Sequence, residues 1–142
     1  MNEYIDELMN LCNIAYKNDE VPIGAVVVYK NQIIGKGYNQ RVHKNDVTAH
    51  AEVIAIKEAE QYLGDWRLND CDLYVTLKPC NMCTEIIKES RINNVYYLIE
   101  KLEFKKGYDK ANICLVDKGL NNEIIDNYKR KLTTFFKSKC NR

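Results

Sequence analysis

Two marks of export or membrane insertion are missing from this 142-residue chain. No stretch approaches the roughly 18 consecutive apolar residues that a membrane-spanning helix needs. The first residues, MNEYIDELMN, lack the basic segment followed by an apolar run that is typical of a secretory signal. We therefore expect a single domain, residues 1–142, that works in the reducing cytoplasm and has no membrane contact.

A strong charge of either sign is lacking as well. The chain has 21 basic and 20 acidic residues, which gives a formal net charge of +1. Without a global attraction to nucleic acid, any RNA binding has to depend on a local basic patch. Lysine and arginine gather at positions 101–110 and 129–142, and we interpret these two groups as candidate phosphate contacts. For any single one of them, a solvated surface position is the simpler explanation.

Cysteine is frequent, with six residues, but a disulfide framework is not expected in a reducing compartment. Cys80 and Cys83 form a C-x-x-C pair. Cys12, Cys71 and Cys114 are scattered and are interpreted as small core residues. The C-x-x-C pair is therefore the cysteine pattern that points to chemistry.

Hydrophobic periodicity predicts an alternation of helices and strands. Helices are expected over 3–17, 49–61, 80–90 and 121–137. Strands are expected over 23–29, 33–38, 73–77, 95–99 and 113–116. The first two strands form a hairpin with a turn at Asn31-Gln32, residues 39–47 form an irregular loop, and Thr48 is the expected cap of the second helix. This order predicts an α/β fold of three layers, α/β/α, around a central mixed five-stranded sheet.

One histidine, two cysteines and one glutamate are spaced to form a catalytic metal site. Cys80 and Cys83 are three residues apart at a predicted helix start, where they share a face and where the helix dipole favours thiolates. His50, at the start of another helix, supplies a third ligand and leaves the fourth zinc position open to water. Because Zn²⁺, two thiolates and a neutral histidine carry no net charge together, the metal stays acidic enough to activate that water.

Glu52 lies two residues after His50 and is expected to accept and return the proton of the activated water. Since side chains two apart in a helix point away from each other, this role requires His50 to lie in an irregular first turn. Two alternatives to a catalytic zinc site stay open. A structural zinc site would need a fourth protein ligand, and a redox cysteine pair would leave the histidine and the glutamate unexplained.

The pairing of H-A-E with P-C-x-x-C resembles the signature of the zinc-dependent nucleoside and nucleobase deaminases. Further segments are similar to the bacterial tRNA-specific adenosine deaminases and narrow the resemblance to that branch and its relatives. These segments are E-V-P-I-G-A-V-V-V (20–28), G-Y-N (37–39), D-V-T-A-H-A-E (46–52), L-Y-V-T-L-K-P-C-N-M-C (73–83) and S-R-I-x-x-V (90–95).

The resemblance implies a cytidine deaminase-like fold and a homodimer that binds one Zn²⁺ per subunit and no organic cofactor. It implies hydrolytic deamination of the wobble adenosine of a tRNA to inosine, on a base unstacked in the anticodon loop. Glu52 would carry protons to N1 of adenine and to the departing ammonia. Asn39 matches a residue that hydrogen-bonds the purine, Ala49 would present a backbone group to the base, and Val21 would line the pocket.

Three departures from the relatives concern the substrate rather than the metal. Lys78 stands where relatives usually have Glu, Val47 replaces a common Pro, and the segment 100–110 is short and lacks a Gly- and Asp-rich loop. We interpret Lys78 either as a contact to phosphate or as a neutral surface exchange. Two other functions stay open, namely deamination of a free nucleobase or nucleoside (guanine, cytosine or cytidine) and zinc-stabilised RNA binding without catalysis.

Overall fold

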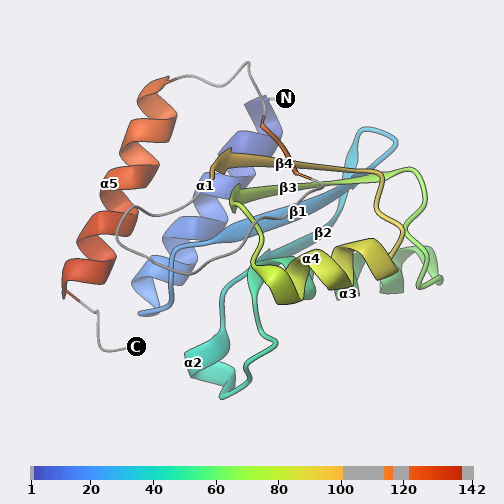
Figure 1. Ribbon diagram of the computed structural model, residues 1–142, viewed down its shortest axis with the longest axis horizontal. Helices are drawn as coiled ribbons and strands as arrows, with labels where there is room; N and C mark the ends of the chain where they lie inside the picture. The colour runs from blue at the N-terminus through green and yellow to red at the C-terminus, as the bar shows by residue number, and fades with distance from the viewer. Residues whose placement is uncertain (1, 101–113, 117–121, 139–142) are drawn as a thin grey trace.

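The computed structural model describes residues 2–100, 114–116 and 122–138 (Figure 1). The basic residues expected at 101–110 therefore lie outside the described part of the chain. Among the described residues, no helix is both long and apolar enough to cross a membrane. The helices are α1 (Asn2–Lys17), α2 (Arg41–Lys44), α3 (Ala51–Leu63), α4 (Asn81–Glu89) and α5 (Asn122–Ser138). The strands are β1 (Gly24–Tyr29), β2 (Gln32–Tyr38), β3 (Cys71–Leu77), β4 (Asn94–Ile99) and β5 (Cys114–Val116).

The strands form a mixed sheet in the order β2-β1-β3-β4-β5. Strand β1 is antiparallel to both β2 and β3, whereas β3, β4 and β5 are parallel to one another. The predicted α/β fold with a mixed sheet is confirmed. The prediction of five strands holds only in part, because four strands of six or seven residues form the body of the sheet. The apolar run near 113–116 is so short that β5 adds only three residues at the edge.

Helices cover both faces of the sheet, with α1 and α5 on one face and α3 and α4 on the other (Figure 1). The alternation of side chains along β1 supplies both cores. Ala25 and Val27 pack in the core beneath α3 and α4, while Val26 and Val28 pack in the core beneath α1 and α5. Both cores contain fully buried apolar residues, so the three layers follow from strands that are apolar on both faces.

Two glycines allow α3 to lie unusually close to β2. A Cβ atom at Gly35 would lie 2.2 Å from the carbonyl oxygen of Ala55, and one at Gly37 would lie 2.2 Å from that of Ala51. Backbone atoms of a helix cannot move aside for a side chain as a flexible side chain can. The G-x-G spacing on one face of β2 therefore fixes the height of α3, including its first turn, above the sheet.

Helix α5 is attached to the sheet by a chain of buried hydrogen bonds. The Tyr128 hydroxyl lies 2.8 Å from both the Pro22 carbonyl oxygen and the Thr76 hydroxyl oxygen. Since a carbonyl only accepts, Tyr128 donates to Pro22 and accepts from Thr76, whose oxygen accepts the Gly24 N–H at 3.2 Å. The hydroxyl groups of Tyr128 and Thr76 are thus both hydrogen-bonded, as buried polar groups between a helix and a sheet need to be.

Two local predictions are corrected by the structure. The hairpin turn lies at Lys30-Asn31 rather than Asn31-Gln32, and both residues have positive φ, 50° and 64°. Two residues in this conformation form the turn whose twist matches the flanking strands, and asparagine tolerates it well. The segment 39–47 is not fully irregular, because it contains the short helix α2.

Candidate metal centre

The two predicted ligand groups lie at the starts of α3 and α4. His50 is the N-cap of α3 and Cys80 is the N-cap of α4, and both have extended backbone conformations. The prediction that Thr48 caps α3 is wrong, because its hydroxyl and its N–H both donate to Asp46 Oδ1 in a local turn. Asn39 does part of the capping instead, since its Oδ1 accepts the Ala51 N–H at 2.8 Å.

His50, Cys80 and Cys83 come together in space, with their ligand atoms all within 4.8 Å of one another. His50 Nδ1 lies 3.5 Å from Cys83 Sγ and 3.8 Å from Cys80 Sγ. A tetrahedral zinc ion with ordinary bond lengths would hold a nitrogen and a sulfur ligand about 3.6 Å apart. The donor set and its spacing therefore fit zinc, and three protein ligands leave one position open. No fourth histidine, cysteine or carboxylate joins this cluster among the described residues.

The electrostatics of the two thiols favour a thiolate at this place. The pKa of Cys80 is lowered to about 4, chiefly because the Cys83 thiol donates a hydrogen bond to it and also because of His50. The pKa of Cys83 is raised, first by that shared proton and then by burial. A divalent cation bound between the two sulfurs would replace the shared proton and hold both as thiolates.

Glu52 lies in the first turn of α3 and only 4% of it is exposed. Burial raises the pKa of its carboxyl group to about 7, and the carboxyl group also shares a hydrogen bond with the Cys83 thiol. Because His50 lies just before the helix, the short H-A-E spacing lets the imidazole join the cluster while the carboxyl group lies beside it, at the Cys83 thiol. The requirement that His50 stand outside the regular helix is thus met, although Thr48 is not the cap.

The three expected base contacts differ in how far their polar groups are already used within the protein. Asn39 is 4% exposed; its Oδ1 is held by Ala51, and its amide NH₂ has no partner in the described part of the chain. The Ala49 N–H donates to the Asp46 carbonyl and the Ala49 carbonyl accepts the Gln40 N–H. Ala49 therefore has only the second lone pair of its carbonyl left for a ligand.

Val21 directly follows the α1–β1 turn and is half-buried, packed against the core beneath α1 and α5. Lys78, whose role the sequence leaves open, lies just before Pro79 and Cys80. Its side chain is 12% exposed, and its Nζ lies 3.4 Å from Glu100 Oε1 and 5.9 Å from the Tyr97 ring centre. The Lys78 ammonium is thus enclosed beside β4 and paired with a carboxylate.

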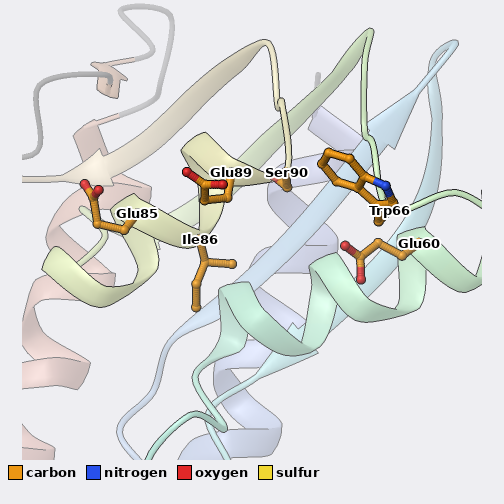
Figure 2. Close-up of a pocket in the computed structure, with 6 residues that line it drawn as sticks. All are labelled: Glu60, Trp66, Glu85, Ile86, Glu89 and Ser90. Atoms are coloured by element: carbon orange, nitrogen blue, oxygen red, sulfur yellow. The ribbon is translucent and has the colours of Figure 1, made fainter.

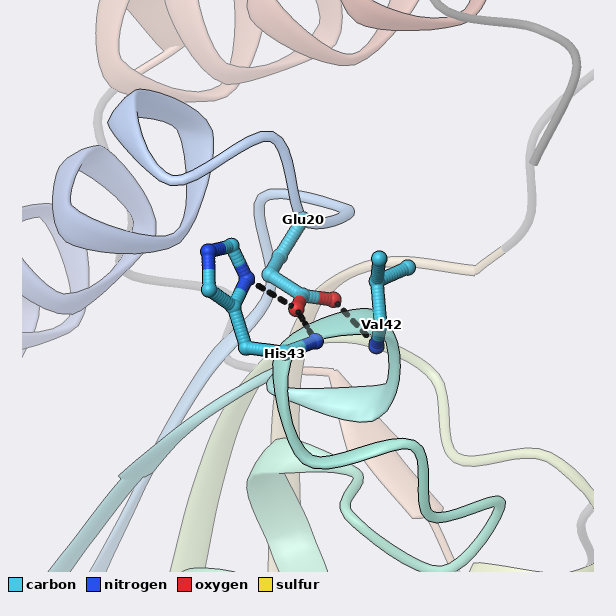
Figure 3. A network of polar contacts seen from close by, with 3 residues as sticks. All are labelled: Glu20, Val42 and His43. Atoms are coloured by element: carbon cyan, nitrogen blue, oxygen red, sulfur yellow. Dashed lines mark hydrogen bonds and ion pairs between the residues drawn. The ribbon is translucent and has the colours of Figure 1, made fainter.

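Sequence reasoning missed Glu20, which is 2% exposed and accepts three hydrogen bonds from the α2 segment (Figure 3). The available signal was its position: Glu20 is an acidic residue directly before the apolar run that enters β1. A charged side chain in such a place is buried only when donors are supplied from elsewhere. Those donors come from about twenty residues further along the chain, so no local pattern announces them.

Three protein donors with an open fourth position and a carboxyl group beside them form the arrangement of a hydrolase that activates water on a metal. The chain belongs to the cytidine and deoxycytidylate deaminase zinc-binding family, whose model matches residues 1–99. All three ligands and Glu52 lie within the matched part.

Within this family, three relatives are informative. The chain is 40% identical over 130 residues to the tRNA-specific adenosine deaminase of Buchnera aphidicola subsp. Schizaphis graminum, covering 88% of this chain and 86% of the relative. A solved structure from studies of A-to-I editing by tRNA:A34 deaminases at the wobble position of transfer RNA is 33% identical, with a TM-score of 0.72 over 82% of this chain and 98% of that one. The guanine deaminase of Bacillus subtilis is 29% identical, with a TM-score of 0.67 over 89% of this chain and 90% of that one.

Proposed function

We propose that the protein deaminates adenosine to inosine at the wobble position of tRNA by zinc-dependent hydrolysis. The observation that carries the proposal is the His50–Cys80–Cys83 cluster with Glu52 buried beside it. It occurs in a chain that is 40% identical, over most of both lengths, to a tRNA-specific adenosine deaminase. The metal chemistry and the substrate class are thus supported by independent observations.

Each site residue has a distinct role in this proposal. When bound at His50, Cys80 and Cys83, zinc supplies a Lewis acid that lowers the pKa of a water to about 7. Glu52 accepts the proton of the attacking water and delivers protons to N1 of adenine and to the leaving amine. Its burial excludes bulk water, so the proton stays on the path between water and base.

The base is held by groups from two segments of the chain. The Asn39 NH₂ is a buried donor without a partner among the residues that the structure describes, and we assign it to an acceptor nitrogen of the purine ring. The Ala49 carbonyl takes a donor of the base, and Val21 forms an apolar wall. These groups read a base that has left its stack, which fits a nucleotide in an anticodon loop.

We further propose that the protein works as a homodimer in the cytoplasm, where its tRNA substrate is found. Tyr62 and Trp66 are large exposed aromatic residues at and beyond the end of α3. Trp66 and Ile86 border a cavity of about 340 Å³ between α3 and α4, with Glu85 at the opposite end from Trp66 (Figure 2). Exposed aromatic side chains beside a cavity are typical of protein–protein contacts.

Light scattering of the purified protein tests this proposal and should give twice the mass of the chain.

Deamination of a free base is the second candidate, favoured by the similarity to the Bacillus subtilis guanine deaminase. A comparison of substrates in parallel separates the two functions. The zinc-loaded protein is incubated with an anticodon stem-loop carrying a wobble adenosine, with free adenosine, with guanine and with cytidine, and the deaminated product is measured. We expect inosine in the stem-loop. Turnover of guanine or cytidine with an unreacted stem-loop would contradict the proposed function.

A further inference from the structure

Residues 40–49 form a closed loop between β2 and α3. The Gln40 N–H donates to the Ala49 carbonyl at 2.9 Å, which joins the two ends of the loop. Within it, Lys44 N–H donates to the Gln40 carbonyl and Asp46 N–H to the Arg41 carbonyl. Asn39 and Ala49, the two residues assigned to the base, stand at the neck of this loop. A shift of the loop therefore moves the Ala49 carbonyl, whereas Asn39 precedes the loop and is held separately by the Ile23 carbonyl and the Ala51 N–H.

Glu20 attaches this loop to the α1–β1 turn. Glu20 Oε2 accepts the His43 N–H at 2.8 Å and lies 2.8 Å from His43 Nδ1, while Oε1 accepts the Val42 N–H at 3.2 Å (Figure 3). The Glu20 N–H in turn donates to the Ala15 carbonyl in α1 at 2.9 Å. The carboxylate thus connects the middle of the loop to the segment that continues into Val21, the proposed apolar wall.

The energetics make this connection strong. A carboxylate that is 2% exposed depends on its hydrogen bonds, because water cannot replace them. Bonds to a charged acceptor are shorter and stronger than those between neutral groups. If the loop moved away, Glu20 would lose three donors at once. Both oxygens are already engaged, so Glu20 is not available as a base for the reaction.

We propose that Glu20 is a positioning residue that sets the 40–49 loop, and with it the Ala49 carbonyl, at the correct distance from Val21 for the base to fit. This inference rests on the proposed function for the identity of the base. The anchoring of the loop can be measured without any substrate. The two ideas can therefore fail separately.

The test uses the full-length zinc protein and the variant Glu20→Gln. An amide of the same shape offers one acceptor oxygen and places an NH₂ group against loop N–H donors. Hydrogen exchange of a peptide covering 40–49 should accelerate at least about tenfold while bound zinc stays at the wild-type level. On the anticodon stem-loop, kcat/KM should fall about 10- to 100-fold, mainly through a higher KM.

Two further variants make the result specific. His43→Ala removes the imidazole contact but keeps both backbone N–H donors, so its effect should have the same direction and be smaller. Asn94→Ala is the control: it removes a hydrogen bond to Asp72 Oδ1. Asp72 lies at the start of β3, at the opposite end of the strand from Cys80, so hydrogen exchange at 40–49 and KM should stay unchanged. Wild-type exchange at 40–49 in Glu20→Gln, or a larger effect in His43→Ala, would overturn the inference. If the wild type does not deaminate the stem-loop but Glu20→Gln still accelerates exchange at 40–49, the proposed function is overturned and the inference about Glu20 stands.

Discussion

Burial distinguishes Glu52 from the other acidic residues on α3. Glu52 is enclosed next to the cysteine pair, whereas Glu58, on the same helix, is exposed. A proton carrier has to touch the reacting atoms and be shielded from bulk water, and only Glu52 combines these conditions among the α3 carboxylates. The distinction between the two glutamates is invisible in composition and depends on the first turn of the helix.

Glu52→Gln should therefore abolish proton transfer without removing a metal ligand. We expect kcat to fall at least about 100-fold with bound zinc unchanged, because proton transfer by a positioned group contributes roughly 10²- to 10⁴-fold. Inosine formation and zinc content are measured on the same sample. Glu58→Gln is the matched control and should behave as wild type. A Glu52→Gln protein with normal turnover would show that another group carries the proton.

Lys78 pairs with Glu100, and charge reversal can distinguish a role of Lys78 in holding the segment before Cys80 from a role in contacting phosphate. If the pair holds the segment before Cys80, Lys78→Glu should weaken zinc binding and activity a few-fold, and Lys78→Glu combined with Glu100→Lys should restore both. The effect is small because Glu100 is largely exposed and its interaction is screened. Zinc affinity and kcat/KM are measured in all three variants. If Lys78 instead contacts phosphate, the double variant stays impaired and Glu100→Lys alone strengthens RNA binding.

At the scale of elements, the site depends on how closely α3 approaches β2. Gly37→Ala would place a methyl group 2.2 Å from the Ala51 carbonyl oxygen and 2.8 Å from the Ala55 nitrogen, so α3 would have to shift. We expect the free energy of unfolding to fall by at least about 2 kcal/mol and zinc affinity to fall with it. Urea unfolding and zinc titration measure the two effects.

Gly64→Ala is the appropriate comparison, since Gly64 caps the other end of α3. No atom lies near its added methyl group, and the only cost is the positive φ of 66°. We expect a loss of about 1 kcal/mol there with no change in zinc affinity. Equal zinc affinities in the two glycine variants would show that the height of α3 does not control the metal site.

Most elements could be predicted because their signals are local. The apolar stripe of α1 and the β-rich run of β1 appear directly in the sequence, and the metal ligands follow from residue types and spacing. The cap of α3 could not be predicted, because Asn39 is twelve residues from Ala51 and replaces the nearby Thr48. The role of Glu20 could not be predicted for the same reason. Its hydrogen-bond donors come from another segment, and long-range bonds from backbone N–H groups to a side chain leave no periodic pattern in the sequence.

At the scale of the whole molecule, the near-neutral charge means that RNA attraction has to come from particular surfaces. Lys129, Arg130 and Lys137 are exposed on α5, and Arg41 and Lys44 are exposed on α2. Between about 50 and 200 mM salt, we expect kcat/KM on the stem-loop to fall at least about tenfold, because each phosphate contact releases counterions. Any turnover of free adenosine should change little over the same range. A stem-loop reaction indifferent to salt would argue against phosphate contacts as a source of affinity.

The position of β1 between β2 and β3 has a consequence for biosynthesis. His50 follows β2 and Cys80 follows β3, so the two ends of the metal cluster belong to strands that are not neighbours. In the folded sheet β1 lies between the two strands, so the native arrangement of the ligands depends on the pairing of β1 with both and requires residues up to Cys83 to have left the ribosome. Because zinc binds the assembled site, its binding free energy adds to the stability of molecules in which the central strand is in register.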